Sequence, residues 1–460
     1  MQLSITALTT LAFVTLAQGM VIPSVEPIKR DQTANSTIAS PPVPKARLIM
    51  APSDVAVANK YIVVMKSNIS STAFQAHKKS VQSIHSTSLA TSQKAFAASS
   101  EGSGIVSEFD IDNYMKGYTG YFTEDTIKSL QQLSEVEFIE QDATVKTFES
   151  AKQTNATWGI SRISSKKSLN GATTGTYLYD DEAGEGVTAF IIDTGVNVKH
   201  EEFQGRASWG KTFPTDGDQD GVGHGTHCAG TVAGKTYGVA KKADIVAVKV
   251  LGNDGSGTNS DVINGIQWAA AQHKNNVATK SGYKGSTANM SLGGGKSTAV
   301  NNAASAAVKA GLMLAVAAGN ENQDACNTSP ASCPDVITVA ASNNKDARAY
   351  FSNYGECVDI FGPGVDILSA WIGSTTATNT ISGTSMATPH ITGLLTYFLS
   401  LAPASDSEFS SASSSLTLEQ IKKAIVAFGT QDVISDVQGT PNVLAYNGAG
   451  GDLSKFWKFV

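Results

Sequence analysis

The chain has 460 residues, 41% of them hydrophobic, which is long enough for one large domain and a smaller one. Its net charge of −6 arises from 34 basic and 40 acidic residues that are interspersed along the chain. This pattern lacks the clustered lysine and arginine of nucleic-acid-binding proteins, so we expect no nucleic-acid partner.

The first 19 residues have the pattern of a signal peptide. Residues 7–16 form a short apolar run, and Ala17, Gln18 and Gly19 follow it as a small-x-small cleavage signal. Residues 20–58 are rich in proline and serine and predict a disordered linker. No later run is long and apolar enough for a membrane span. We therefore expect a protein of the secretory pathway.

Residues 59–149 predict a small α+β domain. Strand-like runs occupy residues 61–65, 105–111, 118–122 and 138–140, and helical patterns occupy residues 73–81 and 124–133. The resulting order is β-α-β-β-α-β, which is typical of a ferredoxin-like unit.

Residues 150–460 predict an α/β domain with a parallel sheet. Continuous apolar runs at residues 187–192, 245–250, 288–292 and 312–317 are typical of strands that are covered on both faces. Helical patterns at residues 261–273 and 299–310 alternate with them, so we expect helices on both faces of the sheet. Near the end, Thr417 and Gln420 form a capping-box pattern, and Gly429 is placed to end that helix.

Asp193 closes the apolar run at residues 187–192. Ligands of open parallel sheets bind at the carboxyl ends of the strands, so a carboxylate at this position is a candidate for chemistry. The alternative is an aspartate that only caps a turn.

His224 stands in a run of small residues that would let a helix pack closely. A zinc site with His227 is the poorer interpretation, because no HExxH glutamate and no third ligand are present. The preceding acidic residues imitate an EF-hand loop, but His227 occupies the twelfth position, where a glutamate is needed.

Ser385 precedes an apolar helical run that contains Pro389 near its start. The free backbone N–H groups and the positive dipole end of a helix N-terminus favour an oxyanion there. A simple N-cap serine is the alternative.

These three segments, in the order Asp193, His224, Ser385, resemble the subtilases, and their surroundings resemble the proteinase K branch. The similarity covers residues 155–447 and is greatest to the cerevisin-type fungal vacuolar proteases. An α/β-hydrolase would need a GxSxG elbow and the opposite chain order. The resemblance implies a serine endopeptidase in which the three residues form a catalytic triad.

The resemblance also implies further site residues. Asn320 matches the family's oxyanion-hole asparagine. The segments that pair with an extended peptide substrate correspond to Gly255, Ser256, Gly257, Ser291, Leu292 and Gly293. Protein and peptide substrates are therefore the expected partners, with a broad preference that leans toward apolar residues.

The cysteines and one possible metal site are implied in the same way. Cys326 and Cys357 match a disulfide of relatives, although a Cys333 to Cys357 pairing stays open. Pro334, Val336 and Asp359 resemble a structural calcium site of two carbonyls and one carboxylate, with a plain turn as the alternative. No cofactor is expected for catalysis.

The resemblance also implies a monomeric zymogen whose small domain is an inhibitory propeptide. The cut is expected within residues 145–153. The resemblance favours the vacuole over secretion, and a catalytically silent binding protein of the same fold is the alternative function. Five sequons are compatible with glycosylation: Asn35, Asn68, Asn155, Asn289 and Asn327.

Overall fold

A computed structural model describes residues 45–51, 56–67, 69–91, 102–111, 115–143, 150–402, 416–449 and 453–457. The predicted signal peptide, residues 20–44 of the predicted linker, and the sequons at Asn35 and Asn68 lie outside the described residues. The chain divides into two units, which are described separately. No described helix has both the length and the apolar character needed to cross a bilayer.

The small unit contains one five-stranded sheet with two helices. Its elements are β1 (Arg47–Ile49), β2 (Ala56–Met65), α1 (Ser71–Thr91), β3 (Gly104–Ile111), β4 (Met115–Tyr121), α2 (Glu124–Leu130) and β5 (Val136–Ala143). The strand order is β1-β5-β2-β4-β3, and β4 pairs antiparallel with both β2 and β3. From β2 onward this is the predicted β-α-β-β-α-β order.

Two predicted residue ranges in the small unit differ from those in the structure. Strand β1 and the start of β2 fall within residues 20–58, so part of the predicted linker is ordered. Helix α1 extends beyond the predicted end at residue 81 to Thr91. The prediction ended too early because the second half of the helix packs through polar side chains. There His85 hydrogen-bonds to Thr126 and Ser103, and Ser88 hydrogen-bonds to Thr123, so apolar spacing gave no signal.

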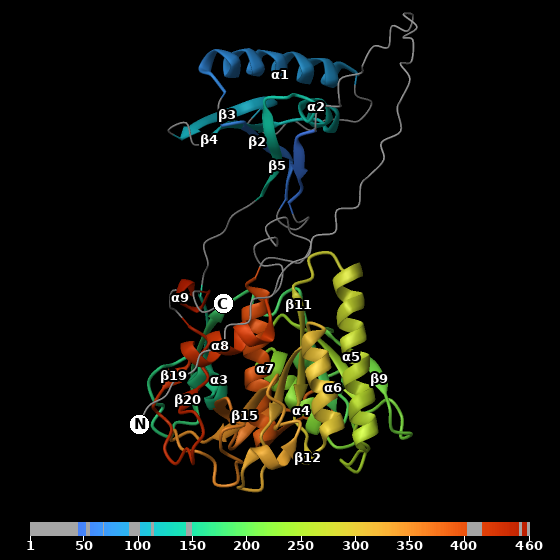
Figure 1. The fold of residues 1–460 in the computed structure, drawn as a ribbon, viewed down its shortest axis with the longest axis vertical. Helices are drawn as coiled ribbons and strands as arrows, with labels where there is room; N and C mark the ends of the chain where they lie inside the picture. Colours follow the sequence, from blue (N-terminus) through green and yellow to red (C-terminus); the bar gives the residue numbers. More distant parts are fainter. Residues whose placement is uncertain are drawn as a thin grey trace, which may run out of the picture. The chain divides into compact units, whose positions relative to one another are not determined.

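The large unit is built on a nine-stranded sheet, as predicted for the α/β domain (Figure 1). In spatial order its strands are β19 (Thr430–Gln431), β20 (Val443–Leu444), β16 (Ile360–Pro363), β15 (Ile337–Ser342), β13 (Met313–Ala317), β11 (Gly285–Met290), β8 (Val187–Asp193), β10 (Asp244–Lys249) and β9 (Ala207–Thr212). All pairs are parallel except β19 with β20.

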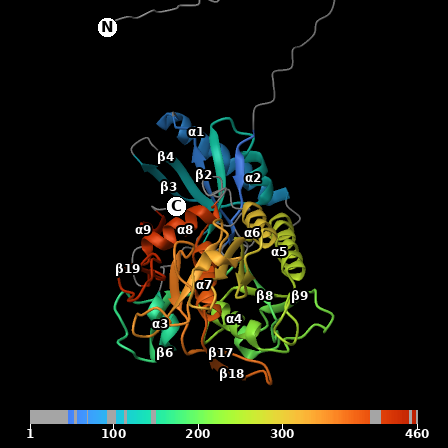
Figure 2. The same ribbon diagram turned by 60° about the horizontal axis from the view of Figure 1, so that its bottom comes forward.

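Helices cover both faces of this sheet. Successive residues of a strand point to opposite faces, so the apolar side chains of the central strands contribute to two separate cores. Ala189 and Ile191 of β8 join a core with α4 (His224–Ala233) and α7 (Thr384–Ser400). Phe190 and Ile192 join a second core with α5 (Asn259–Thr279) and α6 (Thr298–Lys309). Figures 1 and 2 show α5 and α6 side by side.

The shorter elements of the large unit surround the sheet. They are β6 (Ser150–Thr157), α3 (Trp158–Ile163), β7 (Thr174–Asp180), η1 (Glu201–Phe203), β12 (Gly294–Gly295), η2 (Ala325–Asn327), β14 (Thr328–Ser329), β17 (Ile367–Ala370), β18 (Thr378–Ile381), α8 (Leu418–Phe428) and α9 (Ser454–Trp457). The predicted capping box of Thr417 and Gln420 is present at the start of α8, with Gly429 at its end.

Candidate active site

Asp193 is the last residue of the central strand β8, and its side chain is fully buried. Its Oδ1 accepts hydrogen bonds from the backbone N–H of Thr194 (2.7 Å) and from Nδ1 of His224 (2.7 Å). Its Oδ2 has no hydrogen-bond partner among the described residues. The imidazole of His224 is thus the main partner of the buried Asp193 carboxylate. The carboxylate keeps the imidazole proton on Nδ1, so Nε2 is unprotonated and can accept a proton.

His224 is the first residue of α4, and close packing brings it to the end of β8. A Cβ atom at Gly225 would lie 2.1 Å from the carbonyl oxygen of Gly195 and 3.2 Å from Cβ of Asp193, so only glycine permits this approach. The imidazole is 24% exposed and lines a cleft, so one of its edges is accessible to a ligand.

The electrostatic surroundings of His224 favour its charged form. Burial opposes protonation, but the charge and hydrogen bond of Asp193, together with the charge of Asp220, outweigh it and raise the pKa of His224. The imidazolium that forms when a base takes up a proton is therefore stabilised at this position.

Asp220 organises the loop that precedes α4, a role that the sequence analysis missed. Its Oδ1 accepts from the hydroxyl of Thr194 and the N–H groups of Val222 and Gly223, and its Oδ2 accepts from the N–H and hydroxyl of Thr226. This carboxylate ties the loop and the first turn of α4 to the end of β8. The only signal in the sequence was the acidic run that imitates an EF-hand.

Lys249 is a second residue that the sequence analysis missed. Its fully buried ammonium donates to the carbonyls of Thr194 and Leu251 (2.8 Å each) and to Oδ1 of Asn253 (3.2 Å). It lies beside Asp193 in the register of β10 with β8. Lys249 therefore fixes the backbone on both sides of the strand end that carries Asp193.

Ser385 lies in the first turn of α7, as predicted. Its hydroxyl donates to the carbonyl of Ser291 (3.2 Å), and the hydroxyl of Ser291 donates to the carbonyl of Ser385 (2.7 Å). Cys228, one turn beyond His224 on α4, also contacts the Ser385 carbonyl through its thiol (3.4 Å). These bonds hold the N-terminal turns of α4 and α7 against each other.

Asp193, His224 and Cys228 are the only group of three potential metal ligands found in the described part of the chain. The carboxylate and Nδ1 of the imidazole are already joined by a short hydrogen bond, and burial raises the pKa of the Cys228 thiol well above its usual value. The group is therefore organised as a charge pair beside an inert thiol.

Asn320 follows the end of β13 and is oriented by Thr384. Its Oδ1 accepts from the backbone N–H (2.8 Å) and the hydroxyl (2.9 Å) of Thr384. The NH₂ group of Asn320 therefore points away from Thr384. A Cβ atom built on Gly383 would lie 3.7 Å from Nδ2 of Asn320 and 3.6 Å from the backbone N of Ser385. Two N–H donors thus flank one small space next to the serine.

The six predicted substrate-binding residues line one cavity of about 470 Å³ together with His224. They are Gly255, Ser256, Gly257, Ser291, Leu292 and Gly293. A second cavity of about 330 Å³ is lined by Asn320 and Ser385 and shares Leu292, Gly293 and Gly294 with the first. The structure therefore places the predicted substrate-binding residues, His224, Asn320 and Ser385 around two cavities that share lining residues, and Asp193 is buried behind His224.

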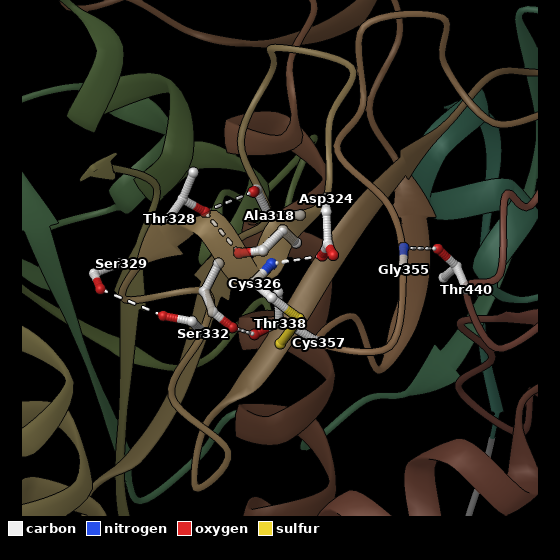
Figure 3. The surroundings of a disulfide bond; sticks show 12 residues. Ala318, Asp324, Cys326, Thr328, Ser329, Ser332, Thr338, Gly355, Cys357 and Thr440 are labelled. Carbon is white, nitrogen blue, oxygen red and sulfur yellow. Dashed lines mark hydrogen bonds between the residues drawn. A yellow bond between two sulfur atoms is a disulfide. The ribbon is translucent and has the colours of Figure 1, made fainter. Parts of the chain in front are cut away.

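The structure joins Cys326 to Cys357, as the resemblance implies (Figure 3). Cys333 is a buried free thiol, so the alternative pairing with Cys357 is wrong. Beside the disulfide, Asp324 accepts from the N–H of Cys326, and Thr328 donates to the carbonyl of Ala318. These contacts anchor the loop that follows Asn320.

At Pro334, Val336 and Asp359 the structure differs from the arrangement that the calcium prediction implied. The three oxygens do converge, but they bind the side-chain ammonium of Lys422. Because this position already holds a positive charge, the residues present do not fit a calcium ion. Lys422 lies on α8, far along the chain from these oxygens, and the sequence analysis did not consider it.

The comparisons with known proteins agree with this geometry. Residues 184–448 match the model of the subtilase family, and residues 60–148 match that of peptidase inhibitor I9. Cerevisin of Saccharomyces cerevisiae is 53% identical over 415 residues, which cover 87% of this chain and 65% of cerevisin. A subtilisin-like serine protease of Rhodotorula mucilaginosa, Rho m 2.0101, is 59% identical over 336 residues, which cover 73% of this chain and 98% of that protein.

A solved structure gives the same result. The crystal structure of a cold-adapted subtilisin-like serine proteinase matches with a TM-score of 0.57 and 44% sequence identity, and the match covers 65% of this chain and all of that chain. The chain belongs to the subtilase family and carries a peptidase inhibitor I9 segment before its subtilase domain.

Proposed function

We propose that this chain is a serine endopeptidase made as a self-processing zymogen. The observation that carries the proposal is the 2.7 Å bond between buried Asp193 and Nδ1 of His224, next to the helix turn that presents Ser385. Family membership and the I9 segment support it over the silent binding protein, because the catalytic positions are intact.

Catalysis begins when Nε2 of His224 takes the proton of the Ser385 hydroxyl, which then attacks the peptide carbonyl. Before attack, the hydroxyl must turn from the Ser291 carbonyl toward His224. Asp193 stabilises the imidazolium, and His224 then returns the proton to the leaving amine. Nδ2 of Asn320 and the N–H of Ser385 donate to the oxyanion. Water then hydrolyses the acyl-enzyme by the same route.

Substrates bind as extended peptides between residues 255–257 and residues 291–293. Apolar side chains line this cavity, including Leu251, Val262, Leu292 and Val300. These side chains support a preference for apolar residues, and the open polar remainder of the cleft supports broad specificity.

Residues 59–149 serve as the inhibitory propeptide and residues 150–460 as the catalytic domain. Strand β6 begins at Ser150 and pairs antiparallel with β7, from Ser150 with Asp180 to Thr157 with Thr174. A peptide bond within a paired strand is protected from cleavage. The cut therefore falls before Ser150, in the first part of the predicted 145–153 range, and leaves the β6–β7 pair intact.

The chain travels through the secretory pathway and functions as a monomer, with the vacuole favoured by its similarity to cerevisin. Of the described sequons, Asn155 and Asn327 are exposed and are suited to carry glycans. Asn289 is fully buried in β11 and is not.

The proposal is tested with a peptide substrate and a serine-directed covalent inhibitor. We expect peptide hydrolysis by the processed enzyme to stop in proportion to labelling, and mass spectrometry of a digest to place the label on Ser385. Labelling of another residue, or hydrolysis that persists in fully labelled protein, would contradict it.

Replacing Asn320 by alanine should lower kcat by about 10²–10³-fold, the size known for the corresponding donor in subtilisin, and should change KM little. The amide donates to an oxygen that becomes negative only during reaction. Steady-state kinetics on a short peptide checks this. A change confined to KM would assign Asn320 to substrate binding instead.

The rate should also fall at acid pH. His224 acts as a base only when neutral, and its raised pKa means that neutral imidazole is lost as the pH falls through a value above 6.5. We expect the acidic limb of kcat/KM to have its midpoint above pH 6.5. A midpoint below that value would contradict the raised pKa.

A further inference from the structure

The oxygens of Pro334, Val336 and Asp359 surround a single nitrogen atom. Nζ of Lys422 lies 3.2 Å from the carbonyl of Pro334, 2.8 Å from the carbonyl of Val336 and 2.7 Å from Oδ1 of Asp359. An ammonium group has three protons and no acceptor. Three oxygens therefore use all of its donors, and the group is fully coordinated by the protein.

The carboxylate of Asp359 is held in place independently of Lys422. Oδ2 of Asp359 accepts from the N–H of Thr338 (2.8 Å), and the N–H of Asp359 donates to the carbonyl of Thr338 (2.9 Å). The hydroxyl of Thr338 in turn donates to the carbonyl of Ala331 (2.8 Å), and Cys357 is tied to Cys326. The position thus combines a preorganised carboxylate with two carbonyls, which are the ligand types of a hard cation, and we call these three oxygens the cradle.

We propose that Lys422 is a built-in substitute for a structural metal ion, so that removing its ammonium turns this cradle into a binding site for a divalent cation of the calcium class. The lysine joins α8 to the 334–336 turn and to the loop that leads into β16, as a bound ion would. The cation is covalently part of the chain, so chelators cannot remove it.

The arrangement differs from an ordinary surface ion pair. Lys423, the next residue on α8, also has a carboxylate partner, with Nζ 2.7 Å from Oε1 of Glu419. The Lys423 side chain is 69% exposed and reaches one oxygen of its own helix, whereas the Lys422 side chain is 22% exposed and joins three separate positions. Lys423→Met is therefore a matched control, because exposed pairs within one helix contribute little to stability.

The test compares Lys422→Met with Lys423→Met as processed enzymes inactivated by a serine-directed inhibitor. In the presence of a chelator, we expect the apparent Tm of Lys422→Met to be about 3–8 °C lower than that of the control, since a partly buried carboxylate loses its partner. Excess calcium should restore at least half of this difference. Calorimetric titration should find one more bound calcium ion in Lys422→Met than in the control, and the added Asp359→Asn change should abolish it.

Two results would overturn the proposal. Equal Tm values for the two variants in chelator would show that the ammonium has no structural role. A destabilised Lys422→Met that gains no calcium ion would show that the cradle does not accept a metal. If Lys422→Met cannot be isolated, Lys422→Ala is produced with calcium present and then treated with chelator. Unfolding on chelation supports the proposal, and an unchanged Tm contradicts it.

Discussion

Replacing Ser385 by alanine should leave the full-length chain uncut and lower kcat by about 10⁶-fold, the size known for the corresponding serine of subtilisin. Without the hydroxyl no acyl-enzyme forms, so the chain can neither hydrolyse peptides nor cut its own propeptide. Intact-mass and N-terminal sequence analysis of the purified wild-type and mutant chains checks this, with the wild type beginning between residues 145 and 150.

Ser382→Ala is the matched control for this experiment. Ser382 lies three residues earlier and is exposed, and its hydroxyl accepts from the N–H of Asp366 and donates to Oδ1 of the same residue. It should be processed normally. A Ser385→Ala chain that is still cut in the absence of any other protease would refute self-processing. A wild-type chain that stays inactive after its propeptide is removed by another protease would refute the proposed activity itself.

Asp193→Asn should lower kcat by about 10⁴-fold while the protein stays folded. The amide keeps the shape of the carboxylate, but it can donate its own hydrogen to Nδ1 of His224. The imidazole proton then resides on Nε2, which can no longer accept from Ser385. The charge that stabilises the imidazolium is lost as well. Kinetics on a peptide substrate, with thermal unfolding as the check of folding, measures both consequences.

Asp181→Asn provides the comparison, since that carboxylate is 70% exposed and lies 3.9 Å from Nζ of Lys242. It should retain normal activity. If Asp193→Asn also kept activity within about tenfold of wild type, His224 would not depend on Asp193, and the triad assignment would fail.

The triad positions could be predicted from sequence because each lies at one end of a strand or helix, where the pattern of apolar residues changes. Asp193 ends a buried strand, and Ser385 begins an apolar helix, so both features are visible within ten residues of sequence. The ferredoxin-like order was visible for the same reason. Strand β1 was missed because it has only three residues and pairs with β5, almost ninety residues later in the chain.

The lysines that were missed contact at least one group that is distant in the sequence. Lys249 and Lys422 are ordinary lysines in their local sequence, and their partners include carbonyl oxygens, which any residue could supply. No pattern of side chains identifies which carbonyls will converge. The metal site at Pro334, Val336 and Asp359 was inferred by resemblance, and nothing in the local sequence indicated that the ammonium of Lys422 lies between these oxygens.

The strand order of the large unit also determines when activity can arise during synthesis. The central strand β8 and helix α4 leave the ribosome early, but α7, which carries Ser385, packs across β11, β13 and β15 and emerges only after residue 384. Strand β16 then pairs with β20, which follows α7 in the sequence. A nascent or prematurely terminated chain would contain Asp193 and His224 without a nucleophile. The topology therefore makes the proposed activity depend on the synthesis of α7, which follows the other two triad residues by more than 150 residues.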